Sequence, residues 1–211
     1  MKTALCLLAS LVFAQVAHAQ NAIEWSKERR LVREDFQGRP PTGATKFSMS
    51  WLNVDASWEC KGGQMNAVVL RATFDPARSW WRTTTGSVWT RVDPSSGIDR
   101  IQSDARRGAE GRDRQLLDHE QLHFDLAELA VRRLRTRFEE MKGACADPDG
   151  EARLHEEVVK ADRDLQQEQA RFDAETSHGS NDLVQNQWGA RIRQQLDLLP
   201  RQPAPAQPRQ R

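Results

Sequence analysis

The chain of 211 residues contains no tyrosine, only three cysteines and almost no net charge. Without tyrosine, no phenol can stabilise an oxyanion in a catalytic site. A formal net charge of +1 gives none of the basic excess that marks proteins binding nucleic acid or anionic membranes. After the first nineteen residues, no run approaches the roughly 18 apolar residues of a membrane helix. We therefore expect no nucleic-acid partner and no integral membrane span.

Residues 1–19 have the pattern of a secretory signal peptide. Lys2 precedes an apolar run from Ala4 to Val16, and Ala17-His18-Ala19 forms a cleavage site with small residues in its first and third positions. Cys6 lies inside the apolar run with no cleavage site after it, so we do not interpret it as a lipidation site. The sequence predicts export to the periplasm or the exterior, with cleavage after Ala19.

Two cysteines remain after that cleavage, Cys60 and Cys145. An even pair in an exported chain predicts a disulfide, because the compartment is oxidising. The alternative is metal ligation. It is disfavoured because neither cysteine has a second cysteine or histidine at ligand spacing.

The motif with most chemical content is His119-Glu120-Gln121-Leu122-His123, which fits the zinc-hydrolase pattern HExxH. On a helix, two histidines four residues apart share one face and can bind one metal ion, while Glu120 can reach a metal-activated water as general base. Apolar residues recur every three or four positions around the motif, so the pair points inward. The alternative is a pair of core histidines that only hydrogen-bond. Burying them with a carboxylate and no partner would be costly, so we favour a metal site.

A catalytic zinc ion needs a third protein ligand and one open position. Asp125 and Glu128 are rotated away from His123 on the same helix, so the third ligand must come from elsewhere. Among the histidines, His178 lies in a break between two helices beside Gly179, whereas His155 borders an apolar stripe. Carboxylates of the second helix are the alternative to His178, and they include Glu151, Glu156 and Asp173.

The arrangement of apolar residues predicts an α+β fold in a single domain over residues 20–199. Alternation over 46–57 and an apolar run, residues 67–70, within 64–74 indicate a small antiparallel sheet that turns at Lys61-Gly62-Gly63. In this sheet Phe47 and Met49 face the core. Three helices follow, at about 113–142, 151–174 and from 182 to about 199, and the first carries HExxH. Residues 93–112 are expected to form a surface loop with at most one helical turn, and 200–211 a disordered tail rich in Pro, Gln and Arg.

The HExxH stretch, together with Thr176-x-His178-Gly179 and Gln187-Trp188, resembles the predicted secreted zinc-dependent proteases of bacteria. The similarity extends upstream to Trp25 and to Asp35-Phe36-x-Gly38-x-Pro40, so it spans most of the mature chain. The resemblance implies a zincin-like active helix, zinc (Zn²⁺) on His119, His123 and His178, and Glu120 as the catalytic carboxylate. It does not identify a substrate.

We therefore expect a secreted or periplasmic zinc metallohydrolase, and specifically a peptidase acting on a peptide or protein substrate. Two alternatives stay open, namely a zinc-binding envelope protein without activity and an amide hydrolase acting on cell-wall peptides. Many zinc peptidases stabilise the oxyanion with Tyr, His or Arg. In this chain the candidates are His155 or an arginine. The tandem tryptophans Trp80 and Trp81 belong either to the core or to a substrate groove.

Overall fold

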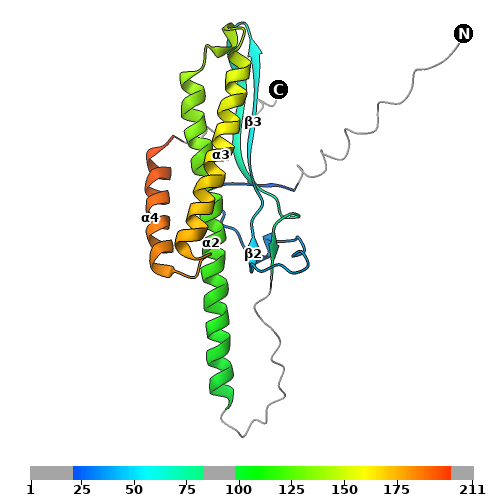
Figure 1. The fold of residues 1–211 in the computed structure, drawn as a ribbon, viewed down its shortest axis with the longest axis vertical. Coiled ribbons are helices and arrows are strands. Elements are labelled where there is room, and N and C mark those ends of the chain that lie inside the picture. The colour runs from blue at the N-terminus through cyan, green and yellow to red at the C-terminus, as the bar shows by residue number, and fades with distance from the viewer. Residues whose placement is uncertain (1–20, 83–97, 201–211) are drawn as a thin grey trace, which may run out of the picture.

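The computed structural model describes residues 21–82 and 98–200, with the backbone alone for 98–110. The fold is α+β, as predicted: a small antiparallel sheet precedes three helices (Figure 1). The predicted signal peptide, Trp89 and the tail from residue 201 lie outside the described residues. None of the helices within the described ranges is long and apolar enough to cross a membrane.

The main sheet is a long hairpin with one added strand. β3 (Leu52–Lys61) pairs antiparallel with β4 (Gln64–Phe74), and β1 (Ile23–Glu24) pairs with the other edge of β4. The hairpin turns at Gly62 and Gly63, whose φ angles are +61° and +73°. This left-handed backbone suits glycine, as the sequence predicted for the turn.

A second sheet of two strands joins β2 (Ser48–Met49) to β5 (Trp80–Trp81). The expectation that Phe47 faces the core was wrong. Phe47 is 51% exposed and Ser48 only 5%, because the face of β2 that carries the serines packs against the HExxH helix. Trp80 is buried and Trp81 makes an edge contact with Phe36, so both tryptophans pack with core residues.

Three helices form the other layer. α2 (Ile98–Glu140) is the longest, and α3 (Gly150–Thr176) and α4 (Asp182–Leu198) pack along its C-terminal part, while its N-terminal part extends beyond them (Figure 1). The predicted bounds of the second and third helices agree within a few residues. The loop predicted for 93–112 was wrong from residue 98 onward. Gly108 and Gly111 suggested a break there, but Ala, Arg, Glu and Gln around them favour a helix.

The core lies around α2, whose C-terminal part contacts β3, β4, α3 and α4. Four residues in its middle, Leu126, Ala127, Leu129 and Val131, are at most 1% exposed. Phe74 from β4, together with Leu165 and Phe172 from α3, is buried against this helix. α2 is thus packed on several sides, which fixes the HExxH turn in a rigid setting.

Arg132 of α2 is a buried cation, 1% exposed. Its Nε donates to Glu128 Oε1 over 2.7 Å, and its Nη1 donates to the carbonyl oxygens of Leu196 and Leu199 at the end of α4. Burial raises the pKa of the Glu128 carboxyl despite its hydrogen bond from Arg132. The Arg132–Glu128 pair therefore links α4 to α2, and separating its two buried groups would be costly because each would lose its partner.

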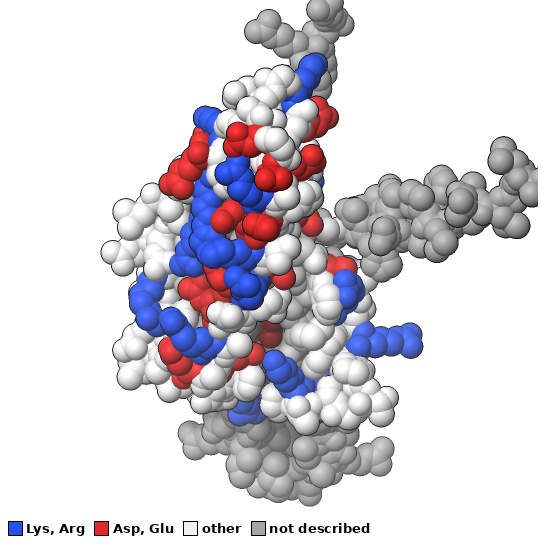
Figure 2. Space-filling view, turned by 45° about the horizontal axis from the view of Figure 1, so that its top comes forward, with Lys and Arg blue, Asp and Glu red and all other residues white. Residues whose placement is uncertain are grey.

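The outer faces of α2 and α3 carry charges of both signs, which interleave on the surface seen in Figure 2. Arg133 of α2 pairs with Glu168 of α3, and Arg137 of α2 pairs with Glu157 and Asp164 of α3. These pairs link the helices across a partly solvated face. Exposed pairs of this kind contribute little each, commonly less than about 1 kcal/mol.

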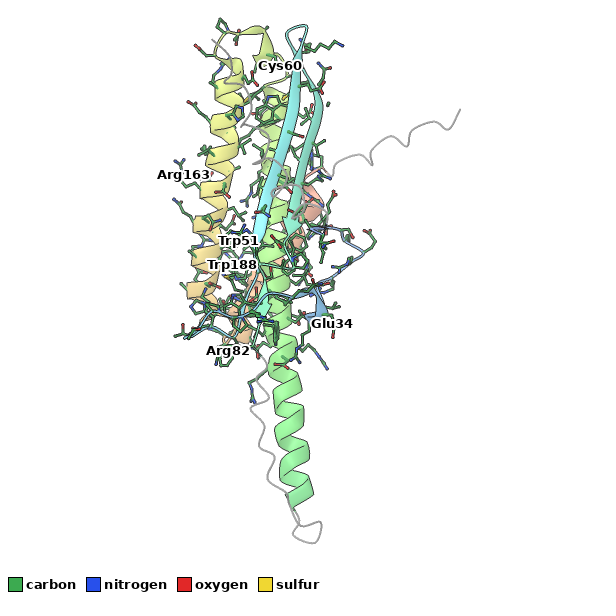
Figure 3. The ribbon with its side chains drawn as sticks, turned by 90° about the vertical axis from the view of Figure 1, so that its right-hand side faces the viewer. Glu34, Trp51, Cys60, Arg82, Arg163 and Trp188 are labelled. Carbon is green, nitrogen blue, oxygen red and sulfur yellow. A yellow bond between two sulfur atoms is a disulfide. The ribbon has the colours of Figure 1, made fainter. Side chains whose placement is uncertain are left out.

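Cys60 and Cys145 form a disulfide with their Cα atoms 5.4 Å apart. Cys60 lies near the hairpin turn, as Figure 3 shows, while Trp51 and Trp188 lie toward the other end of the hairpin. Cys145 belongs to a short 3₁₀ helix (Ala144–Ala146) that follows α2. The bond joins sheet and helices at the end of the molecule remote from the HExxH motif.

Two residues of the upstream resemblance have clear packing roles. Trp25 Nε1 donates to Asp125 Oδ1 over 2.8 Å, which fastens the N-terminal segment to α2. A side chain at Gly38 would place its Cβ 2.7 Å from the carbonyl oxygen of Ser79 and 2.8 Å from that of Ala77. Only glycine fits that approach.

Candidate metal centre

His119 and His123 lie one turn apart on α2 and face the same side, as their spacing predicts. Their Nε2 atoms are 3.1 Å apart and their rings meet edge to face. Both residues are buried, with exposed fractions of 2% and 8%. Two ring nitrogens therefore converge on one point inside the fold.

Asp173 of α3 supplies the third converging atom. Its Oδ1 lies 3.0 Å from His119 Nε2 and 2.9 Å from His123 Nε2, so the three atoms form a nearly equilateral triangle. Burial by itself raises the pKa of Asp173, but the neighbouring rings of His119 and His123, followed by the ammonium of Lys46, outweigh burial and leave the pKa well below its ordinary value. Asp173 is thus a carboxylate, the state in which it ligates a metal. His119, His123 and Asp173 together form a buried group that can hold a metal ion.

The hydrogen bonds around His119 favour a cation within the triangle. Gln185 uses its Nε2 to donate to the carbonyl oxygen of Gln115, so its Oε1 is the acceptor that faces His119 Nδ1, 3.1 Å away. His119 must then carry its proton on Nδ1, and in a neutral ring Nε2 has only a lone pair. That lone pair faces a carboxylate oxygen at 3.0 Å, an arrangement that a bound cation stabilises.

His123 is held less completely. Its Nδ1 is buried and has no hydrogen-bond partner among the residues that the structure describes. The ring is instead fixed by packing, since Phe172 contacts it edge to face and stacks on His119 with ring centroids 4.6 Å apart. Trp188 packs on the other side of Phe172.

His178 lies beside the triangle and not within it. Its Nδ1 is 3.2 Å from Asp173 Oδ2, the oxygen that points away from the histidine pair, and its side chain is 60% exposed. Lys46 Nζ approaches the same oxygen at 3.1 Å. As placed, His178 and Lys46 orient Asp173 so that its Oδ1 is left for a metal. Of the alternatives that the sequence left open for the third position, Asp173 is the one brought to the histidine pair.

The loop that carries His178 is sharply bent. Ser177 and His178 both have φ near +52° and Gly179 has φ +84°, so three successive residues are left-handed. A Cβ at Gly179 would lie 3.1 Å from His119 Cγ. The Thr-x-His-Gly stretch therefore reverses the chain after α3 and packs its glycine directly on a candidate ligand.

Glu120 is buried, 4% exposed, and its carboxylate is held by two serines. Ser48 Oγ donates to Oε1 and Ser50 Oγ donates to Oε2, each over 2.5 Å. Glu120, His119, His123 and Asp173 all line one cleft with a volume of about 620 Å³, whose other walls come from β2, its flanking residues and α3. Clefts of this volume accommodate a drug-sized ligand.

The triangle has dimensions suited to a tetrahedral metal. Zinc bonds of about 2.0–2.1 Å separate neighbouring ligand atoms by roughly 3.3–3.4 Å in a tetrahedral site. The three atoms here are 2.9–3.1 Å apart, so they need to spread by only a few tenths of an ångström. Two imidazoles and one carboxylate are also a recurrent catalytic zinc donor set.

The remaining residues singled out from the sequence lie elsewhere. His155 contacts Trp58, with ring centroids 4.7 Å apart, and does not line the cleft. Asp125 accepts hydrogen bonds from Trp25 and Gln121 on another face of α2. Glu151 and Glu156 are exposed near the start of α3.

The sequence interpretation missed Ser48, Ser50, Lys46 and Gln185. Ser48, Ser50 and Lys46 occupy alternate positions in and beside β2, and their polar side chains all contact a carboxylate of the centre. That alternation was visible in the sequence. The buried face was nevertheless assigned to the apolar residues between them, Phe47 and Met49. Gln185 lies on α4 with no sequence signal linking it to His119.

Comparisons with protein-family models, with curated proteins and with solved structures found no match to this chain.

Proposed function

We propose that the protein is an exported zinc-dependent hydrolase that cleaves peptide bonds. The observation that carries this proposal is the convergence of His119, His123 and Asp173 beside the buried carboxylate of Glu120 in one cleft. A structural zinc site needs ligands only. A hydrolytic site also needs a base next to an accessible space, and the cleft has both.

When bound, zinc lowers the pKa of a water molecule toward about 7 and polarises a substrate carbonyl. Glu120 then acts as general base: it accepts the proton of the attacking water as the new C–O bond forms, and it delivers that proton to the nitrogen as the C–N bond breaks. Lys46 and His178 line the same cleft, and each can donate a hydrogen bond to the oxyanion in a chain that has no tyrosine.

Export is part of the proposal. The signal-like residues 1–19 and the disulfide between Cys60 and Cys145 both support an oxidising compartment.

A second candidate is a zinc-binding envelope protein without activity. It is favoured by one observation, the position of His178 beside Asp173, with its Nδ1 3.2 Å from Oδ2. In this candidate, the loop that carries His178 rearranges so that the imidazole becomes a fourth ligand. A closed four-ligand site is structural, whereas an open one binds water.

Turnover by the zinc-loaded protein separates the candidates. Wild type and Glu120→Gln are compared on a broad peptide library and on cell-wall peptides, with zinc content measured in parallel. The proposal expects cleavage by wild type and a decrease of at least about 100-fold in the variant at equal zinc content. Wild type that holds one zinc ion per chain and cleaves neither substrate class would contradict it.

A further inference from the structure

The segment around β2 has a two-residue periodicity that the fold uses at the candidate metal centre. Lys46, Ser48 and Ser50 lie at alternate positions, so in an extended chain their side chains point to the same side. Each of them contacts a carboxylate of the centre: Lys46 reaches Asp173, and both serines reach Glu120. One short segment, Lys46 to Ser50, therefore contacts two acidic groups that come from two different helices.

The two serines hold Glu120 symmetrically. Ser48 donates to one carboxylate oxygen and Ser50 to the other, each over 2.5 Å. This short distance is typical of a hydrogen bond from a hydroxyl to a charged oxygen. Each oxygen has two acceptor sites, so one site on each stays free for a proton. The plane of the carboxylate is fixed, while its capacity to act as a base is retained.

We infer that Ser48 and Ser50 are positioning residues for Glu120 in the hydrolysis. This inference rests on the proposed function and concerns the orientation of the Glu120 carboxylate, the general base. A glutamate side chain has three rotatable bonds, so an unrestrained Glu120 would sample orientations that cannot reach the water. The serine pair keeps it in one orientation in the free protein, which is the preorganisation that a proton transfer requires.

A purely structural role would also place hydroxyls here, because a buried carboxylate needs hydrogen-bond partners. The two roles differ in what depends on Glu120. If the serines act through Glu120, removing them costs little once the base itself is gone. If they only stabilise the fold, the loss is the same with or without the base.

The experiment uses the full zinc-loaded chain with Ser48→Ala, Ser50→Ala and the double variant, each alone and combined with Glu120→Gln. Ser57→Ala, at an exposed serine of β3, is the matched control. We expect kcat to fall by roughly tenfold to hundredfold in each single alanine variant, the scale of a hydrogen bond to a charged group, with KM and zinc content unchanged. Ser50→Thr, which keeps the hydroxyl, should recover most of the rate. In the Glu120→Gln background the same serine changes should alter kcat less than about twofold.

Crystal structures of the wild type and the double alanine variant give a readout independent of activity. We expect Glu120 in one conformer in the wild type and in several in the variant. An unchanged kcat in the alanine variants, an equal loss in the Glu120→Gln background, or an unmoved Glu120 in the double variant would each overturn the positioning role and leave the proposed function standing. Wild type without any turnover would overturn the proposed function, and the positioning role with it.

Discussion

The third ligand of the proposed centre can be tested with Asp173→Asn and His178→Ala, which should weaken zinc binding to different extents. Asparagine keeps the size of Asp173 and an oxygen acceptor, but it removes the negative charge that faces both histidines at 2.9 and 3.0 Å. His178→Ala removes a group that contacts only the outer oxygen of Asp173, at 3.2 Å. The first change removes a ligand charge, and the second removes a support.

The magnitudes follow from the free energy of zinc binding. Structural sites with four ligands bind zinc with about 10–16 kcal/mol, or roughly 2.5–4 kcal/mol per ligand. At about 1.4 kcal/mol per tenfold change, loss of the Asp173 ligand should weaken zinc binding on the order of 10²- to 10³-fold. Loss of a group that orients a ligand typically costs 10–100-fold, so His178→Ala should lie in that lower range.

The assay is competition for zinc against a chelator of known affinity, with circular dichroism to verify that each variant is folded. Asp162→Asn, an exposed carboxylate change on the same helix, is the control and should bind zinc like the wild type. Wild-type affinity in Asp173→Asn, together with a larger loss in His178→Ala, would refute the reasoning and assign the third position to His178.

Three further outcomes are expected. Zinc at 1,000 times its Kd should stabilise the fold by about 4 kcal/mol. Removing the zinc with a chelator should therefore lower Tm by roughly 8–16 °C in calorimetry. An unchanged Tm would argue against a site formed only in the folded chain. Reduction of the Cys60–Cys145 disulfide, or its replacement by two serines, should destabilise the chain by at most about 4.5 kcal/mol in urea unfolding. Two free thiols found by alkylating the unreduced protein would show that the disulfide does not form. Arg132→Met should cost about 3–5 kcal/mol because the buried Glu128 loses the hydrogen bond and the positive charge of Arg132. Adding Glu128→Gln should restore part of that loss, and equal stability of the single and double variants would contradict this.

The helices were accessible from the sequence because their signals are local. Apolar spacing around His119 and His123 predicted a helix with both rings on its buried face. α4 begins at residue 182, as predicted, and the Asn181 side chain there accepts a hydrogen bond from the backbone N–H of Val184. The extension of α2 back to Ile98 was missed because a polar segment with two glycines carries no apolar stripe.

The geometry of the centre could be predicted only in part, because its contacts join distant segments. Asp173 was one of several carboxylates on α3, and only the packing of α3 against α2, with Phe172 against both histidine rings, selects it. The role of Ser48 depends on which face of β2 meets α2. Side chains alternate between the two faces of a strand, so an assignment that is off by one residue exchanges the faces. The sequence interpretation placed Phe47 on the inward face.

The most direct test of the metal centre is an anomalous difference map from crystals of the zinc-loaded protein, collected at the zinc absorption edge. We expect one peak per chain within bonding distance of His119 Nε2, His123 Nε2 and Asp173 Oδ1, with a fourth position open to the cleft and Glu120 outside bonding distance. A map with no peak between these three atoms, or a peak ligated by Glu120, would contradict the account.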